Sequence, residues 1–204
     1  MALVAEREGR REEAEKLLGK LVAASPDWEE AAFRLGYVQL QKGEYASAID
    51  RLQACLKKRP DWLEARLNLG LAYWKSGDAK SASEQYGKAL AADPANVEAL
   101  RALTAMAIER EEAAEASELH RKFTAAGGRS AELAFNLGLL LQSTGASEKA
   151  VECYRTAVAA KANFTEALLN LGHALRASGQ EQEAKLAWSK AMQAAPELAA
   201  KYFP

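Results

Sequence analysis

The sequence has few of the residues that build disulfide frameworks or metal centres. Its 204 residues include two cysteines, Cys55 and Cys153, and two histidines, His120 and His173. Two cysteines do not make a disulfide framework. Neither histidine has a second ligand at a metal-binding spacing such as H-x-x-x-H, and the sequence contains no C-x-x-C. We therefore expect no metal ion, no cofactor and no catalytic residue.

An excess of charge of one sign is also missing. The chain has 27 Lys and Arg against 28 Asp and Glu, so no global field favours nucleic acid or an anionic membrane. The one concentrated basic run, Lys57-Lys58-Arg59, lies at the end of a predicted helix, where cations complement the helix dipole.

Long apolar runs are absent as well, so we expect no membrane insertion. The N-terminal stretch MALVAEREGRREEAEKLL is too charged for a signal peptide. We expect a cytoplasmic protein, or a periplasmic one if an export signal is missing from this sequence.

Proline is scarce, and the alternating β-branched pattern of strands is rare, which together indicate a helical protein. Four of the five prolines share one phase of a repeat of 34 residues: Pro26, Pro60, Pro94 and Pro196. Leu-Gly pairs recur in register with them as Leu35-Gly36, Leu69-Gly70, Leu137-Gly138 and Leu171-Gly172. A second glycine recurs as Gly9, Gly43, Gly77, Gly145 and Gly179. No insertion breaks this register.

Each repeat has the pattern of two helices, as residues 61–94 illustrate. Gly77 permits the tight turn between them, and Pro94 stops the second. A glycine inside a helix, such as Gly70, costs about 1 kcal/mol relative to alanine. Because Gly70 and Ala82 are small, we expect the two helices to approach closely there, and this packing to offset the cost.

This pattern resembles the tetratricopeptide repeat family, whose signature is W-x-x-L-G-x-x-Y followed by an alanine, an aromatic residue, an alanine and a proline. The resemblance covers essentially the whole chain. It implies an all-α protein: a right-handed α-solenoid, or superhelix, of helix-turn-helix repeats with a 34-residue period. We expect a single array over residues 1–204, with a partial repeat at 1–28, full repeats at 29–62, 63–96, 97–130, 131–164 and 165–198, and the start of a further repeat at 199–204.

The ends of the array lie inside repeats, and arrays need polar capping helices. We therefore expect a fragment of a longer array or of a larger protein; the alternative is that the ends pack against a second copy. Within the array, we expect three capping boxes at the starts of first helices: Asp27-x-x-Glu30, Asp61-x-x-Glu64 and Asn163-x-x-Glu166.

Repeat 97–130 departs from the pattern. Thr104 replaces the helix glycine, Glu111 replaces the turn glycine, and His120 occupies the aromatic slot. Gly127-Gly128 stands in for the closing proline and is expected to cap the helix. The repeat is a hinge, a local change in the superhelical pitch, or the result of ordinary drift. We expect His120 to be packed, and likewise Cys55, which replaces a small core alanine.

In family members, the first helices line a concave groove. The resemblance therefore implies an apolar groove here, with aromatic residues concentrated toward the N-terminal half. We expect the following groove residues: Phe33, Arg34, Tyr37, Leu40, Leu67, Asn68, Leu71, Trp74, Ile108, Phe135, Asn136, Leu139, Leu169, Asn170 and His173. The alternative is that neighbouring helices cover much of this stripe.

Asn68, Asn136 and Asn170 each stand directly before a Leu-Gly pair. In family members, an asparagine at this position often binds a ligand's main chain, and an amide can both donate and accept. The alternative is a consensus residue without a ligand.

These observations favour a non-catalytic adaptor that binds a peptide or a helix of a protein partner in the groove, and no nucleic acid. Two alternatives stay open. One is a scaffold that self-associates into a homo-oligomer through the groove or the open ends. The other is the substrate-docking part of a larger enzyme, such as a glycosyltransferase.

Overall fold

The computed structural model describes residue 2 and residues 8–196, and all regular structure within them is helical. Eleven helices are described: α2 (Arg11–Ala24), α3 (Glu29–Lys42), α4 (Tyr45–Lys58), α5 (Leu63–Lys75), α6 (Ala79–Ala92), α7 (Val97–Glu109), α8 (Ala113–Ala125), α9 (Ala131–Ser143), α10 (Ser147–Ala160), α11 (Thr165–Ala177) and α12 (Glu181–Ala194). The predicted all-α fold is therefore confirmed.

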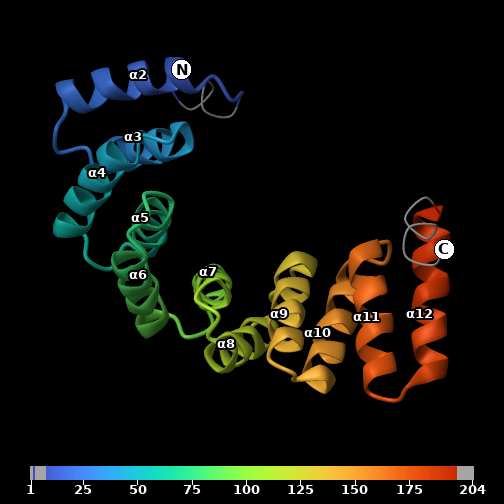
Figure 1. The fold of residues 1–204 in the computed structure, drawn as a ribbon. Coiled ribbons are helices and arrows are strands. Elements are labelled where there is room, and N and C mark those ends of the chain that lie inside the picture. The colour runs from blue at the N-terminus through green and yellow to red at the C-terminus, as the bar shows by residue number, and fades with distance from the viewer. Residues whose placement is uncertain (1, 3–7, 197–204) are drawn as a thin grey trace. The chain divides into compact units, whose positions relative to one another are not determined.

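From α2 to α6 and from α8 to α12, each helix packs against the next, so each of these stretches is a solenoid of antiparallel helices (Figure 1). We call α3, α5, α7, α9 and α11 the first helices of the pairs, and α4, α6, α8, α10 and α12 the second helices. The chain divides into two compact units, residues 1–99 and residues 100–204, with the boundary inside α7.

The glycines inside the first helices mark the closest approach of each pair. A Cβ on Gly70 would lie 3.0 Å from the ring of Tyr86, and a Cβ on Gly138 would lie 2.6 Å from the ring of Tyr154. Both tyrosines are almost fully buried. Burying one such side chain contributes about 1.5–3 kcal/mol, which exceeds the helix penalty of glycine. The predicted close approach of the two helices is confirmed; the contacting residue is the aromatic side chain sixteen positions further along.

The turn between the two helices of a pair needs a residue in the left-handed backbone conformation, with positive φ. Glycine provides it at Gly43, Gly77, Gly145 and Gly179, with φ between +76° and +92°. The following amide closes the helix end, as in the 2.9 Å bond from the Asp78 amide to the Tyr73 carbonyl. The irregular repeat keeps this geometry without glycine, since Glu111 adopts φ +59°.

The end of α8 confirms the predicted glycine cap. Gly127 has φ +86°, and the amide of Gly128 donates to the Phe123 carbonyl at 2.9 Å. The two glycines have different roles. A Cβ on Gly128 would lie 2.3 Å from the Phe123 ring, so this position is kept small by packing rather than by a positive φ.

The three predicted capping boxes are wrong. The first helices α3, α5 and α11 begin one residue later than the boxes require, after Trp28, Trp62 and Phe164, and these positions form no side-chain cap. Asp27 instead pairs with Lys58 at 2.9 Å, which joins the start of α3 to the end of α4.

Side-chain caps occur at helix starts for which no capping box was predicted. Asp78 accepts from the Ser81 amide at 3.0 Å, Asn96 from the Ala99 amide at 3.0 Å, and Ser130 from the Leu133 amide at 3.1 Å. Each is the residue directly before its helix, the position that favours these side chains.

Candidate functional site

Three of the predicted groove residues are covered by the chain itself. Leu40, Leu67 and Leu169 are between 5% and 7% exposed, and Leu40 and Leu169 belong to the hydrophobic cores of their units. These three side chains lie beneath the surface of the first helices and do not form part of it. The concern that neighbouring helices cover part of the stripe therefore applies to these positions.

In unit 1 the remaining groove residues lie on α3 and α5 and are half-buried. The Phe33 ring packs on Trp62 with centroids 4.5 Å apart, and Leu71 lies against the same core. Arg34 forms an ion pair with Glu30 at 2.9 Å. Tyr37, Asn68 and Trp74 complete this set, which we call the unit 1 patch.

In unit 2 the surface is more open. Leu139 on α9 is 41% exposed, and Asn136, one turn earlier, is also exposed. Phe135 beside them is half-buried against Phe164, with ring centroids 4.9 Å apart. We call Ile108, Phe135, Asn136, Leu139, Asn170 and His173 the unit 2 patch.

Two of the predicted asparagines are oriented by their own helices. The side-chain amide of Asn68 donates to the Glu64 carbonyl at 2.9 Å, and that of Asn170 donates to the Glu166 carbonyl at 2.8 Å. Each uses one N–H in this way, and the amide carries a second N–H and an oxygen. The local bond therefore holds the side chain in place with hydrogen-bonding capacity left over.

The titratable groups of the described residues have little reactive character. Burial raises the pKa of the Cys153 thiol to about 11 and also raises that of Cys55, so both thiols are protonated at neutral pH. Both cysteines are free and buried, as expected for Cys55. Burial lowers the pKa of His120 and of His173. Within the described part of the chain, no three His, Cys, Asp or Glu residues are grouped to hold a metal ion.

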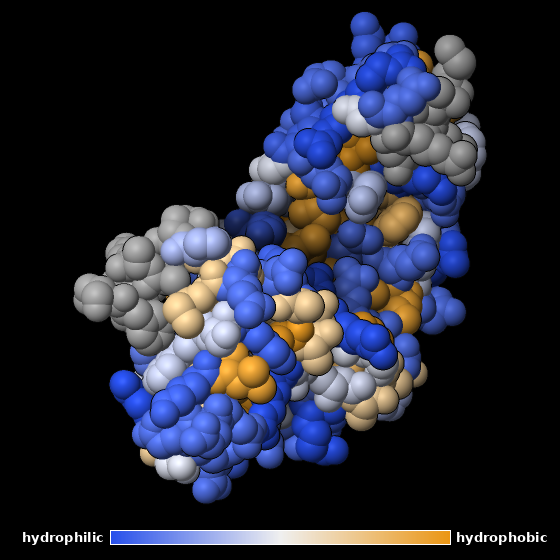
Figure 2. Space-filling model, turned by 90° about the vertical axis from the view of Figure 1, so that its right-hand side faces the viewer, coloured by the Kyte–Doolittle hydropathy of each residue, from blue (hydrophilic) through white to orange (hydrophobic). Residues whose placement is uncertain are grey.

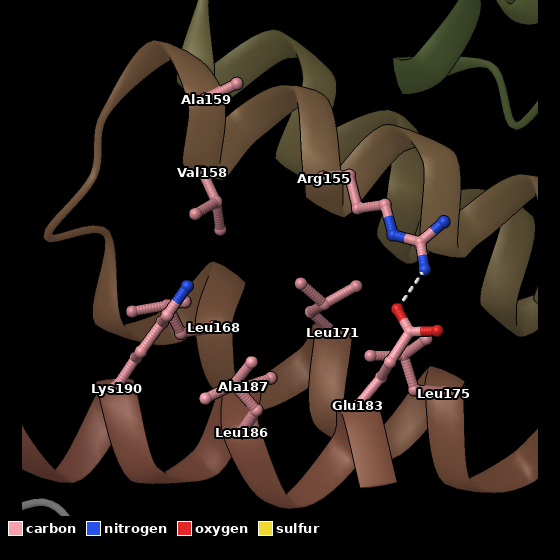
Figure 3. A pocket seen from close by; sticks show the side chains of 10 residues that line it. All are labelled: Arg155, Val158, Ala159, Leu168, Leu171, Leu175, Glu183, Leu186, Ala187 and Lys190. Atoms are coloured by element: carbon pink, nitrogen blue, oxygen red, sulfur yellow. Dashed lines mark hydrogen bonds and ion pairs between the residues drawn. The ribbon is translucent and has the colours of Figure 1, made fainter. Parts of the chain in front are cut away.

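Five surface cavities of unit 2 lie outside the predicted groove. No groove residue lines any of these five. Figure 3 shows one of about 300 Å³ between α10, α11 and α12, with Leu168, Leu171 and Leu186 on its walls and the Arg155–Glu183 ion pair at one side.

These residues were missed because the sequence analysis looked for a binding surface only on the first helices. The signal that could have found them is Leu186, an apolar residue outside the repeat pattern that is 57% exposed. Figure 2 views the molecule from the side where α12 lies and shows such orange side chains exposed among blue ones.

The comparisons with known proteins bear on the repeats. Two family models, each described as tetratricopeptide repeat, match residues 5–67 and 39–106, and residues 131–164 and 165–198. The chain belongs to the tetratricopeptide repeat family. Residues 107–130 lie outside all four matches, and they contain most of the irregular features of repeat 97–130.

Several solved structures of similar fold are of a tetratricopeptide repeat protein named MamA. One crystal structure of MamA has a TM-score of 0.70 and 27% identity over 81% of this chain and 97% of the other. A second has a TM-score of 0.72 and 27% identity over 86% of this chain and 96% of the other. The C-terminal part of a TPR repeat-containing protein from Cytophaga hutchinsonii has a TM-score of 0.82 and 16% identity over 98% of this chain and 80% of the other. This similarity concerns the fold alone.

No curated protein is significantly similar to the chain. Among the helices that the structure describes, none has the length and apolar character needed to cross a bilayer. The family supports a role in protein interaction.

Proposed function

We propose that this tetratricopeptide repeat chain is a non-catalytic interaction module that binds a peptide or a helix of another protein on its first helices. The observation that carries the proposal is Leu139, an apolar side chain 41% exposed beside the exposed amide of Asn136. An apolar contact next to an amide suits a peptide, because the amide can pair with the main chain while the leucine packs on a side chain.

The two patches would contribute separately. The unit 1 patch offers Phe33, Tyr37, Leu71 and Trp74 as half-buried apolar surface. The unit 2 patch offers Phe135 and Leu139. Burying the exposed part of one such leucine would contribute on the order of 1 kcal/mol, so affinity must come from several contacts together.

The non-catalytic part of the proposal is supported by the chemistry of the described residues. The thiols are protonated and buried, and the two histidines are held in packed positions by Phe123 and Trp188. The patches consist of apolar and amide side chains together with Arg34 and His173, which favours recognition over bond making.

The test selects peptides from a display library on the purified chain and measures the affinity of the best binder. The Leu139→Ser variant should bind about tenfold more weakly, as expected for the loss of roughly 1.4 kcal/mol. Leu186→Ser is the matched control, since it removes an exposed leucine of the same unit from a second helix. Equal affinities for wild type and Leu139→Ser would contradict the proposal.

Light scattering separates the self-association alternative. A mass that rises with concentration and falls back to the monomer in Leu139→Ser would favour a scaffold over a peptide-binding module. A mass that does not change with concentration would favour a patch that binds another protein over a self-associating scaffold.

A further inference from the structure

The irregular repeat contains a buried histidine nitrogen without a hydrogen bond. His120 on α8 is 8% exposed, and its Nε2 has no partner among the described residues. Its ring packs near Phe123, with centroids 6.1 Å apart. Buried polar groups are nearly always bonded, so an orphaned nitrogen indicates a missing partner.

Two cavities flank this ring. One of about 370 Å³ and one of about 440 Å³ are both lined by His120, Thr124 and Thr156. They lie between α8 and α10, and the smaller one also reaches the α8–α9 loop. Small residues of α10 line this space, namely Thr156, Ala159 and Ala160, and histidine takes the slot that a tyrosine fills in repeats 63–96 and 131–164.

The charge on the lining of the smaller cavity is positive. Its one charged lining residue is Arg129, which is exposed, and Ser130 beside it caps the N-terminus of α9. A helix N-terminus presents unpaired amides and the positive end of the dipole. No carboxylate lines this cavity. The larger cavity carries Glu152 together with Lys149 and Arg121, so its charges are mixed.

A third concavity continues the smaller one outward. It shares Arg129 and Ser130 and adds Arg101, Lys161 and Glu132. The cations outnumber the carboxylate along this path, so an anion approaching the N-terminus of α9 is attracted.

We propose that the cavity between α8, the α8–α9 loop and α10 binds the oxyanion of a small molecule, a phosphate or a carboxylate. With its proton on Nε2, the neutral His120 ring donates one hydrogen bond, Arg129 supplies a charged donor pair, and the hydroxyl of Ser130, directly before α9, supplies a further donor. None of the groove residues lines this cavity, so the site is independent of the peptide-binding function.

The test is a titration of the full chain with inorganic phosphate and, separately, with acetate, at constant ionic strength. The ring signals of His120 are followed by NMR. The sequence has only one other histidine, His173, which therefore serves as an internal reference. Sodium chloride is the control salt.

We expect a saturable shift of the His120 signals with at least one oxyanion and no shift of His173. Arg129→Ala should weaken this binding about tenfold, because it removes the charged donors. Lys190→Ala, which removes an exposed cation on α12, should leave it unchanged. His120→Phe, which keeps a ring in the slot, should weaken binding as well when it is followed by calorimetry.

Phosphate binding without acetate binding assigns a phosphorylated ligand, and the reverse assigns a carboxylate ligand. The proposal is overturned if neither anion gives a saturable shift, if chloride produces the same shift, or if Arg129→Ala binds as tightly as wild type. Circular dichroism of each variant confirms that the helices are intact.

Discussion

Trp188 occupies the space that a side chain at position 172 would need. A Cβ on Gly172 would lie 2.1 Å from Nε1 of the indole, the shortest such distance for any glycine described. The same nitrogen donates to the Leu169 carbonyl at 3.2 Å. Trp188 therefore joins α12 to α11 by packing and by a hydrogen bond, and both require a glycine on the facing helix.

Gly172→Ala is expected to destabilise unit 2 by about 1–3 kcal/mol, since the added methyl displaces the indole from a packed position. Gly36→Ala is the matched control, because its Cβ would meet Arg51 and Leu52 at 3.3 Å. There the gain in helix propensity, about 1 kcal/mol, offsets the tighter contact. Urea denaturation followed by circular dichroism measures both, and equal losses would contradict the packing account.

Glu111→Gly should stabilise the chain by about 1 kcal/mol, because glycine adopts the left-handed conformation at no steric cost. Glu111 holds φ +59° at the turn where the other pairs have glycine. Gly145→Ala is the reverse control. It has φ +80° with open space around it, so strain is its main penalty. The midpoint of thermal denaturation should rise for Glu111→Gly and fall for Gly145→Ala.

Asn96→Ala should cost about 1 kcal/mol, since it removes the side chain that caps α7. Asn163→Ala is expected to be close to neutral, because α11 begins after Phe164 and has no side-chain cap. The midpoint of urea denaturation compares these two asparagines. A larger loss of stability for Asn163→Ala than for Asn96→Ala would contradict this and indicate that Asn163 caps α11.

The stability of unit 2 should fall as the pH drops below the ordinary histidine pKa of about 6.5. Burial lowers the pKa of His120 and His173 in the folded state, so the unfolded state binds more protons in that range. Denaturation at about pH 7.5 and about pH 5.5 measures the change. His120→Phe should reduce the dependence. An unchanged dependence in that variant would show that His120 is not responsible.

The repeat could be predicted from sequence because its constraints are local. A turn that needs positive φ selects glycine, as at Gly77, and a close helix pair selects a small residue, as at Gly70. Both signals recur every 34 residues and reinforce one another. The helix starts were predicted less well, because Asp-x-x-Glu fits a cap at several offsets, and only the backbone at Trp62 shows where α5 begins.

The candidate sites could be predicted only in part, since burial depends on neighbouring repeats. Leu71 and Leu139 occupy the same position of two repeats, yet Leu71 is half-buried and Leu139 is 41% exposed. The cavity at His120 depends on small residues such as Ala159, which lie about 40 positions along the chain. A pattern within one repeat does not specify such spaces between repeats.

The central claim is that the first helices bind the ligand. The most direct measurement places a photo-crosslinking benzoylphenylalanine at position 139 of α9, or at position 186 of α12, and irradiates the complex with the selected peptide. The account predicts a cross-linked product from position 139 and none from position 186. Cross-linking from position 186 alone would contradict it and move the binding site to the second helices.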